Sequence, residues 1–218
     1  MSKTANKGFR KNFLFIILIV AFVSLPLATM VFADTTSTQF SHQITEGILS
    51  VDIVDGAGNT VVSPSVGFSS VSYSFVAQNT TGTLGTASEK IRVTNATTTA
   101  AWSLNIAATG GVSAVWSDGG TNTHPYNDVT SADNGRLTVD PSGATLAAVD
   151  VGCTTTDITK GTADTFISGT VNSIDLLTAG ALAGTGCRWD LTGVSLTQRI
   201  PALQEVATYT LGMTLTAL

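Results

Sequence analysis

The sequence predicts an all-β protein, built as an antiparallel β-sandwich of Ig-like or jelly-roll-like type. Three observations support this. Apolar and polar residues alternate in many short runs, which is the period of a half-buried strand. Gly, Asn and Asp residues that favour turns separate these runs. Ser, Thr, Gly, Ala and Val dominate, and only 11% of the residues are charged, a composition typical of secreted β-proteins.

A signal-peptide helix is predicted before the sandwich, in residues 1–33. Four basic residues and no acidic one precede an apolar run from 13 to about 23. The segment ends in Val-Phe-Ala, with small or tolerated residues where a signal peptidase reads. We therefore expect export, with cleavage after Ala33, to an extracellular or cell-surface location. Retention as a membrane anchor is the alternative, because 13–33 is about long enough to span a bilayer.

The remaining chain is expected to form one domain. Residues 34–45 are polar and predict a flexible N-terminal arm. Residues 46–218 carry the strand pattern throughout, with no boundary strong enough to divide them.

The strands follow from the alternating runs. In the first run, Leu49, Val51 and Ile53 share one face, and a hairpin turn is expected over 55–59. In each later run, the apolar residues likewise share one face of their own strand. The four sets are Val71, Tyr73 and Phe75; Ile91 and Val93; Trp102, Leu104 and Ile106; and Tyr209, Leu211, Met213 and Leu215. Residues 118–135 are expected to form the longest loop, with few apolar groups to order it. Residues 176–182 also fit one short helix, which the sequence leaves open.

The charge balance argues against nucleic-acid binding. Residues 1–33 hold four of the ten basic residues and none of the 15 acidic ones, so the rest of the chain has a net charge of about −9. Nucleic-acid binding relies on Lys and Arg that neutralise phosphates. An acidic surface also has no electrostatic attraction to anionic lipid. We therefore expect membrane contact only through an uncleaved signal segment.

The two cysteines, Cys153 and Cys187, predict a disulfide. Cysteines of exported proteins usually pair in an oxidising compartment. Closing a loop of this length stabilises the fold by on the order of 4 kcal/mol in the chain-entropy model. Two Cys without a nearby His do not complete a zinc shell.

No catalytic set is apparent, so we expect that the protein is not an enzyme. The only histidines are His42 and His124, and neither has a recognisable nucleophile beside it. The chain contains neither a Gly-x-Ser-x-Gly elbow nor a His-Glu-x-x-His motif.

No cofactor is expected, with one weak exception. Asp118, Asp128 and Asp133 lie in a Gly-rich and Asn-rich loop that offers oxygen ligands for Ca²⁺. The spacing fits no EF-hand. The competing interpretation is a set of Asx turns in a solvated loop.

Two blocks of sequence resemble a known family. Residues 90–95, Lys-Ile-Arg-Val-Thr-Asn, are followed by Ala-Trp-Ser-Leu-Asn-Ile at 101–106, and Ile-Pro-Ala at 200–202 leads into a final run at 207–215. In this order they resemble the WxL cell-wall-binding domain over 46–218. The form is divergent, because the second Trp-x-Leu, at 189–191, lies one strand before the last.

This resemblance implies an exported surface protein that binds peptidoglycan or other surface proteins non-covalently. The residues it implicates in ligand binding are Trp102, Leu104, Trp189 and Leu191. The competing interpretation is that these four side chains pack the core, because a buried Trp supplies a large apolar area. Trp116 stands beside a Gly-rich turn and is the better candidate for an exposed aromatic that stacks on sugar rings.

A second hypothesis belongs to a different class. Low charge and Thr-rich strands also suit a structural subunit of an extracellular fibre or surface layer. Such a subunit would assemble when a strand edge accepts a strand from its neighbour.

Overall fold

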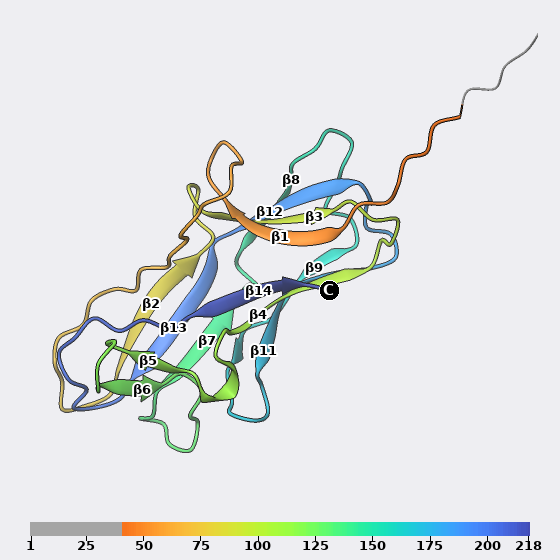
Figure 1. Ribbon diagram of the computed structural model, residues 1–218. Helices are drawn as coiled ribbons and strands as arrows, with labels where there is room; N and C mark the ends of the chain where they lie inside the picture. The colour runs from red at the N-terminus through yellow and green to blue at the C-terminus, as the bar shows by residue number, and fades with distance from the viewer. Residues whose placement is uncertain (1–40) are drawn as a thin grey trace, which may run out of the picture. The chain divides into compact units, whose positions relative to one another are not determined.

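The computed structural model describes residues 41–218, and residues 44–218 form one compact unit (Figure 1). The predicted signal peptide and its cleavage site lie outside the described residues. Of the predicted arm, only 41–45 are described, and they are exposed and have no regular structure. Within 41–218, no helix has the length and hydropathy needed to cross a bilayer.

The predicted all-β, antiparallel fold is confirmed. Sheet 1 has the order β1 (Leu49–Val54), β3 (Lys90–Asn95), β12 (Cys187–Thr192), β8 (Thr145–Ala148). Sheet 2 has the order β10 (Asp164–Thr165), β7 (Arg136–Asp140), β13 (Val194–Ile200), β2 (Gln78–Leu84). Sheet 3 has the order β14 (Met213–Ala217), β4 (Trp102–Ala108), β11 (Ser173–Ala179), β9 (Ile158–Lys160). A small hairpin joins β5 (Val115–Ser117) to β6 (Thr123–Pro125), and a 3₁₀ turn covers Gly111–Ser113.

Two neighbouring glycines carry the chain between sheet 1 and sheet 2. Gly85 connects β2 to β3, and Gly193 connects β12 to β13. Both have positive φ, 79° and 82°, a conformation that glycine adopts without strain. The Gly193 N–H donates to the Gly85 carbonyl at 2.7 Å. A Cβ at Gly85 would lie 2.8 Å from the carbonyl oxygen of Leu191, so a side chain is excluded there.

The three sheets share one hydrophobic core, as expected of a sandwich. Alternate residues of β4 point inward, which gives a strictly alternating buried and half-buried pattern from Trp102 to Ala108. The inward residues of β3 and β12 belong to the same core cluster. Sheets 1 and 3 meet where the rings of Trp102 and Trp189 lie 5.3 Å apart. β1 and β14 lie next to each other at the edge between these two sheets (Figure 1).

Several predicted elements are confirmed. β1, β3 and β4 fall on the first, third and fourth alternating runs. The turn over 55–59 closes with Asp55 N–H donating to the Asn59 carbonyl at 2.8 Å. In the last run only β14 is a strand, and Tyr209 and Leu211 precede it.

The strand predicted around Val71, Tyr73 and Phe75 is wrong. Residues 70–77 form no strand, and these three side chains are exposed. They lie in a long loop between β1 and β2, where neighbouring Phe68 makes only an isolated bridge to Gly82. The alternation is present in the sequence, but within residues 41–218 no second layer covers its apolar face.

The helix considered for 176–182 is also wrong, because most of this segment belongs to β11. The pairing with β4 shifts register between Asp175 and Leu177, which marks Leu176 as the extra residue of a β-bulge. The bulge turns Leu176 and Leu177 both inward, and both are fully buried. Two adjacent buried leucines interrupt the period of two, which explains why the segment does not have a strand pattern.

The predicted 118–135 loop is more ordered than expected. It contains β6, and Tyr126 at its centre is buried against Phe166, with ring centroids 5.2 Å apart. The predicted Cys153–Cys187 disulfide is present, with Cα atoms 5.9 Å apart. It ties the loop after β8 to the start of β12.

Candidate functional site

Both Trp-x-Leu segments lie inside the core. Trp102 is 4% exposed and Trp189 is fully buried. Leu104 and Leu191 are fully buried beside them. These four side chains therefore pack the core, and a ligand would reach them only if the sandwich opened.

The two indoles differ in their polar contacts. Trp189 Nε1 donates to the Thr154 carbonyl at 2.8 Å, in the loop held by the disulfide. Trp102 Nε1 is buried and has no hydrogen-bond partner among the described residues.

Trp116 is half-buried on β5 and belongs to a row of aromatic side chains. Its Nε1 donates to Gln198 Oε1 at 2.8 Å, and Gln198 is itself almost fully buried. Phe68 packs edge-on against it at 5.4 Å, and His124 stacks on it at 5.9 Å. Tyr209 packs edge-on against His124, with ring centroids 5.1 Å apart. Burial lowers the pKa of His124, and the contact with the Pro125 carbonyl opposes that effect.

The three aspartates considered for calcium make separate contacts, and two of them are local. Asp118 accepts from the Gly120 N–H at 2.7 Å and from Asn122. Asp128 accepts from the N–H and hydroxyl of Thr130. These hydrogen bonds lower the pKa of Asp118 and of Asp128.

Asp133 instead pairs with Arg199 at 2.8 Å. Across residues 41–218, no three His, Cys, Asp or Glu side chains come together closely enough to hold a metal ion. Asp118 and Asp128 thus make the contacts of local turns, whereas Asp133 makes an ion pair with β13.

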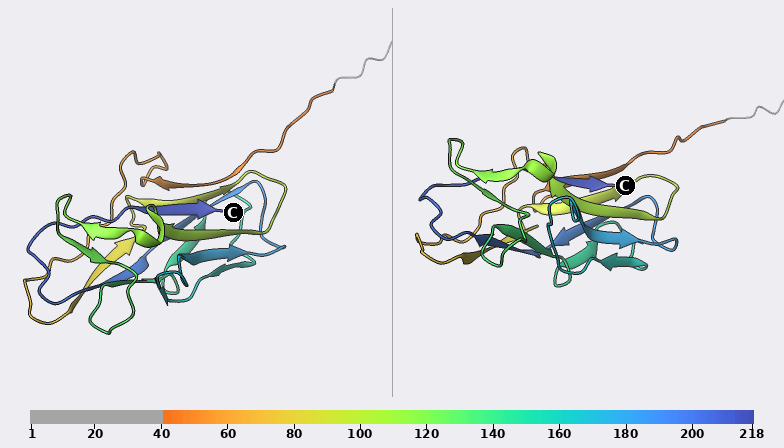
Figure 2. Two further views of the ribbon diagram at one scale, coloured as in Figure 1. Left: turned by 60° about the horizontal axis from the view of Figure 1, so that its bottom comes forward. Right: turned by 90° about the horizontal axis from the view of Figure 1, so that it is seen from below.

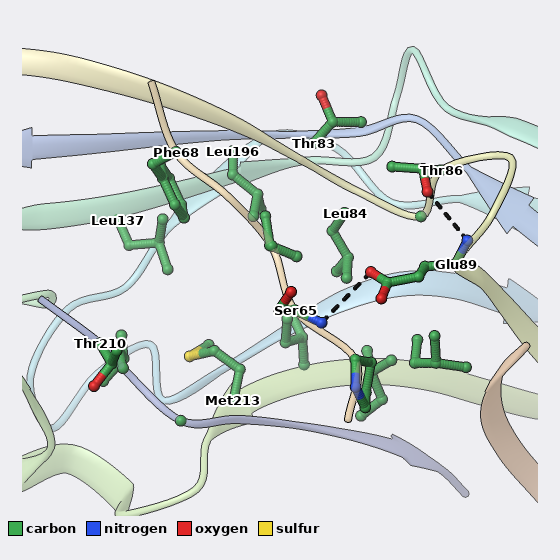
Figure 3. Close-up of a pocket in the computed structure, with 18 of the residues that line it drawn as sticks. Ser65, Phe68, Thr83, Leu84, Thr86, Glu89, Leu137, Leu196, Thr210 and Met213 are labelled. Atoms are coloured by element: carbon green, nitrogen blue, oxygen red, sulfur yellow. Dashed lines mark hydrogen bonds between the residues drawn. The ribbon is translucent and has the colours of Figure 1, made fainter. Parts of the chain in front are cut away.

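A cavity of about 420 Å³ lies between sheet 2 and β14 (Figure 3). Leu84, Leu137 and Leu196 line it from β2, β7 and β13, and Met213 lines it from β14. The segment 64–68 and residues 209–212 form its sides. A volume of this size lies within the range of small-molecule pockets.

One carboxylate lies at one end of this cavity, beside two hydroxyl side chains. Ser65 and Thr86 are exposed there, and Glu89 is half-buried between them (Figure 3). The Ser65 N–H faces a Glu89 carboxylate oxygen at 3.4 Å, and the Glu89 N–H donates to the Thr86 hydroxyl at 3.1 Å. The cavity thus joins an apolar interior to an acidic entrance.

A second surface, the apolar tip, consists of Tyr73, Phe75, Val76, Leu203 and Val206. The loops that carry it, before β2 and after β13, project together at one end of the sandwich in all three views (Figures 1 and 2). The Leu203 N–H donates to the Ser74 carbonyl at 2.8 Å and ties them. All five side chains are exposed, from 49% for Tyr73 to 83% for Val206.

One residue of the tip has a strained backbone conformation. Leu203 has φ of 58°, the left-handed region, which costs a leucine on the order of 1 kcal/mol. Tyr73 and Phe75 meet edge to face at 5.7 Å. The tip therefore presents two aromatic rings and three aliphatic side chains to solvent, on two loops that contact each other.

Sequence reasoning missed both surfaces. The cavity draws its residues from 53 to 215, and no local pattern marks them. The loop that carries the tip does have a local signal, the alternation of Val71, Tyr73 and Phe75, but this pattern predicts a strand. Comparison of the chain with protein-family models, with curated proteins and with solved structures finds no match.

Proposed function

We propose that this chain is an exported, non-enzymatic cell-surface module that binds non-covalently to a cell-wall polymer or to another surface protein. The signal-peptide pattern of residues 1–33 supports export. The disulfide supports an oxidising compartment. The resemblance to the WxL domain supports the cell wall as the partner.

The observation that carries the proposal is the apolar tip. Monomeric soluble proteins rarely leave several large apolar side chains together on the surface unless they bind something. Phe75 is 80% exposed beside Tyr73, so two ring surfaces are available to a partner. Aromatic faces suit both sugar rings and apolar protein surfaces. We therefore assign binding of the partner to the tip rather than to the buried Trp102 and Trp189.

One observation favours the second candidate, a structural subunit. Residues 70–76 have the alternation of a half-buried strand, yet they pair with no strand within residues 41–218. A segment with this alternation is able to add to the sheet edge of a neighbouring copy when it becomes extended. In that case the partner of the tip is another copy of the chain.

Co-sedimentation with isolated bacterial cell walls tests the first candidate. The protein is the chain from residue 34, which retains the whole compact unit 44–218. The double variant Phe75→Ser, Val206→Ser removes the two most exposed tip side chains. We expect its wall-bound fraction to fall at least fivefold, because about 1 kcal/mol of contact energy corresponds to that factor.

The matched control is Leu182→Ser, which removes an equally exposed leucine in the loop between β11 and β12. Its binding should equal that of the unmodified chain. Equal loss in control and tip variants would contradict binding through the tip. Filaments that sediment without any wall, and that disappear in the tip variant, would instead establish the structural subunit.

A further inference from the structure

The cavity between sheet 2 and β14 has a role that the tip does not explain. Its interior is aliphatic, and Leu84, Leu137 and Leu196 are buried at its floor. An ordered water needs two to four polar partners, and the aliphatic part of this lining offers few. An apolar chain suits the space better than water does.

The walls of the cavity are held in place. Phe68 packs edge-on against Trp116, which is anchored by its hydrogen bond to buried Gln198. Gly82 on β2 allows the segment 66–68 to lie close, because a Cβ there would stand 3.2 Å from Val66 and 3.3 Å from Phe68. These contacts hold Trp116 and the segment 66–68 in place along the cavity.

The acidic side chain at the polar end of the cavity has no cationic partner among the described residues. Glu89 forms no salt bridge within the described part of the chain. The cations nearest to it in the sequence, Lys90 and Arg92, both pair with Asp190, at 3.6 and 2.7 Å. A carboxylate at the polar end of an apolar cavity is complementary to a cationic head group on an apolar chain.

We propose that this cavity binds a small amphiphile with a protonated amine and an unbranched apolar chain. The chain lies against Leu84, Leu137 and Leu196, and the ammonium group pairs with Glu89. An amphiphile with a carboxylate head is disfavoured, because it would meet Glu89 with like charge. This site shares none of the five side chains of the apolar tip and does not depend on the function proposed for them.

Calorimetric titration with three ten-carbon probes tests the site. Decylamine, decanol and decanoate are added below their micellar concentrations, at pH 7, to the chain from residue 34. That chain omits the apolar segment 13–23, which would bind amphiphiles non-specifically. We expect decylamine to bind most tightly, decanol about fivefold more weakly, and decanoate more weakly still.

Two variants and a control locate the binding. Glu89→Gln should weaken decylamine about fivefold and leave decanol within twofold. Met213→Trp fills the cavity from β14 and should abolish binding of both. Glu205→Gln, an exposed carboxylate outside the cavity, should change neither.

Three results would overturn the proposal. The first is that none of the probes binds. The second is that decanoate binds as tightly as decylamine. The third is that Met213→Trp, with a native near-UV spectrum, binds decylamine unchanged. Because no cell wall is present, these results are independent of the wall-binding test.

Discussion

At the scale of single residues, Trp102 and Trp189 have the same burial and ring contact but different polar contacts. Trp189 donates to the Thr154 carbonyl, whereas Trp102 Nε1 is buried without a partner among the described residues. A buried unpaired N–H carries its full desolvation cost. Two tryptophans that look equivalent in the sequence are thus expected to contribute unequally to stability.

Replacing each indole by phenylalanine measures this difference. Both changes remove similar volume, but only Trp189→Phe loses a hydrogen bond, and Trp102→Phe removes an unsatisfied donor. We expect Trp102→Phe to lower the free energy of unfolding by about 1 kcal/mol less than Trp189→Phe does. Urea unfolding of both variants gives the comparison. Equal losses would show that Trp102 Nε1 is satisfied in solution.

At the scale of elements, β11 shows how one extra residue changes what a strand buries. Because the bulge at Leu176 turns both Leu176 and Leu177 inward, both are fully buried in the core. In a regular strand one of the two would face solvent. Their burial is thus a direct test of the bulge.

Alanine substitutions in β11 make that test. Leu176→Ala and Leu177→Ala should each lower the free energy of unfolding by about 3 kcal/mol, because each leaves a cavity in the core. Thr178→Ala, at an exposed position of the same strand, should change it by less than about 0.5 kcal/mol. A small effect at either leucine would indicate a regular strand.

The elements also show which features the sequence encodes locally. β1, β3 and β4 were predictable because each buries one face against a sheet formed by the same chain. The Val71 to Phe75 run has the same alternation and no such sheet, and the pattern alone does not reveal whether a covering layer exists. β11 was missed because its bulge breaks the period of two.

The candidate sites were the least predictable part. The cavity forms where segments from 53 to 215 meet. Lys90 and Arg92 pair with Asp190, which the register of β12 on β3 places opposite Arg92. Residue spacing within one strand reveals neither the facing segments nor that register.

At the scale of the whole molecule, the disulfide is the strongest single constraint. It closes a loop of sequence separation 34 that contains β9, β10 and β11. It also holds the loop in which Thr154 accepts from Trp189, next to the core. Its loss thus acts on the unfolded chain through entropy and on the folded chain through this contact.

The double variant Cys153→Ala, Cys187→Ala should lower the free energy of unfolding by about 4 kcal/mol. Reduction of the unmodified chain with dithiothreitol should have the same effect, and should leave the double variant unchanged. Chemical denaturation under both conditions measures the loss. A loss below about 1 kcal/mol would mean that the loop is already restricted in the unfolded chain.

The segment that carries Tyr73 and Phe75 has a further consequence, for the unfolded chain. Between Asp55 and Glu89 the sequence contains no charged residue. An uncharged run with alternating apolar side chains is the composition that favours cross-β aggregation. In most proteins folding removes such a segment from solvent, but here it remains at the surface. The side chains available to a partner are thus also those that we expect to favour self-association as the concentration of the chain rises.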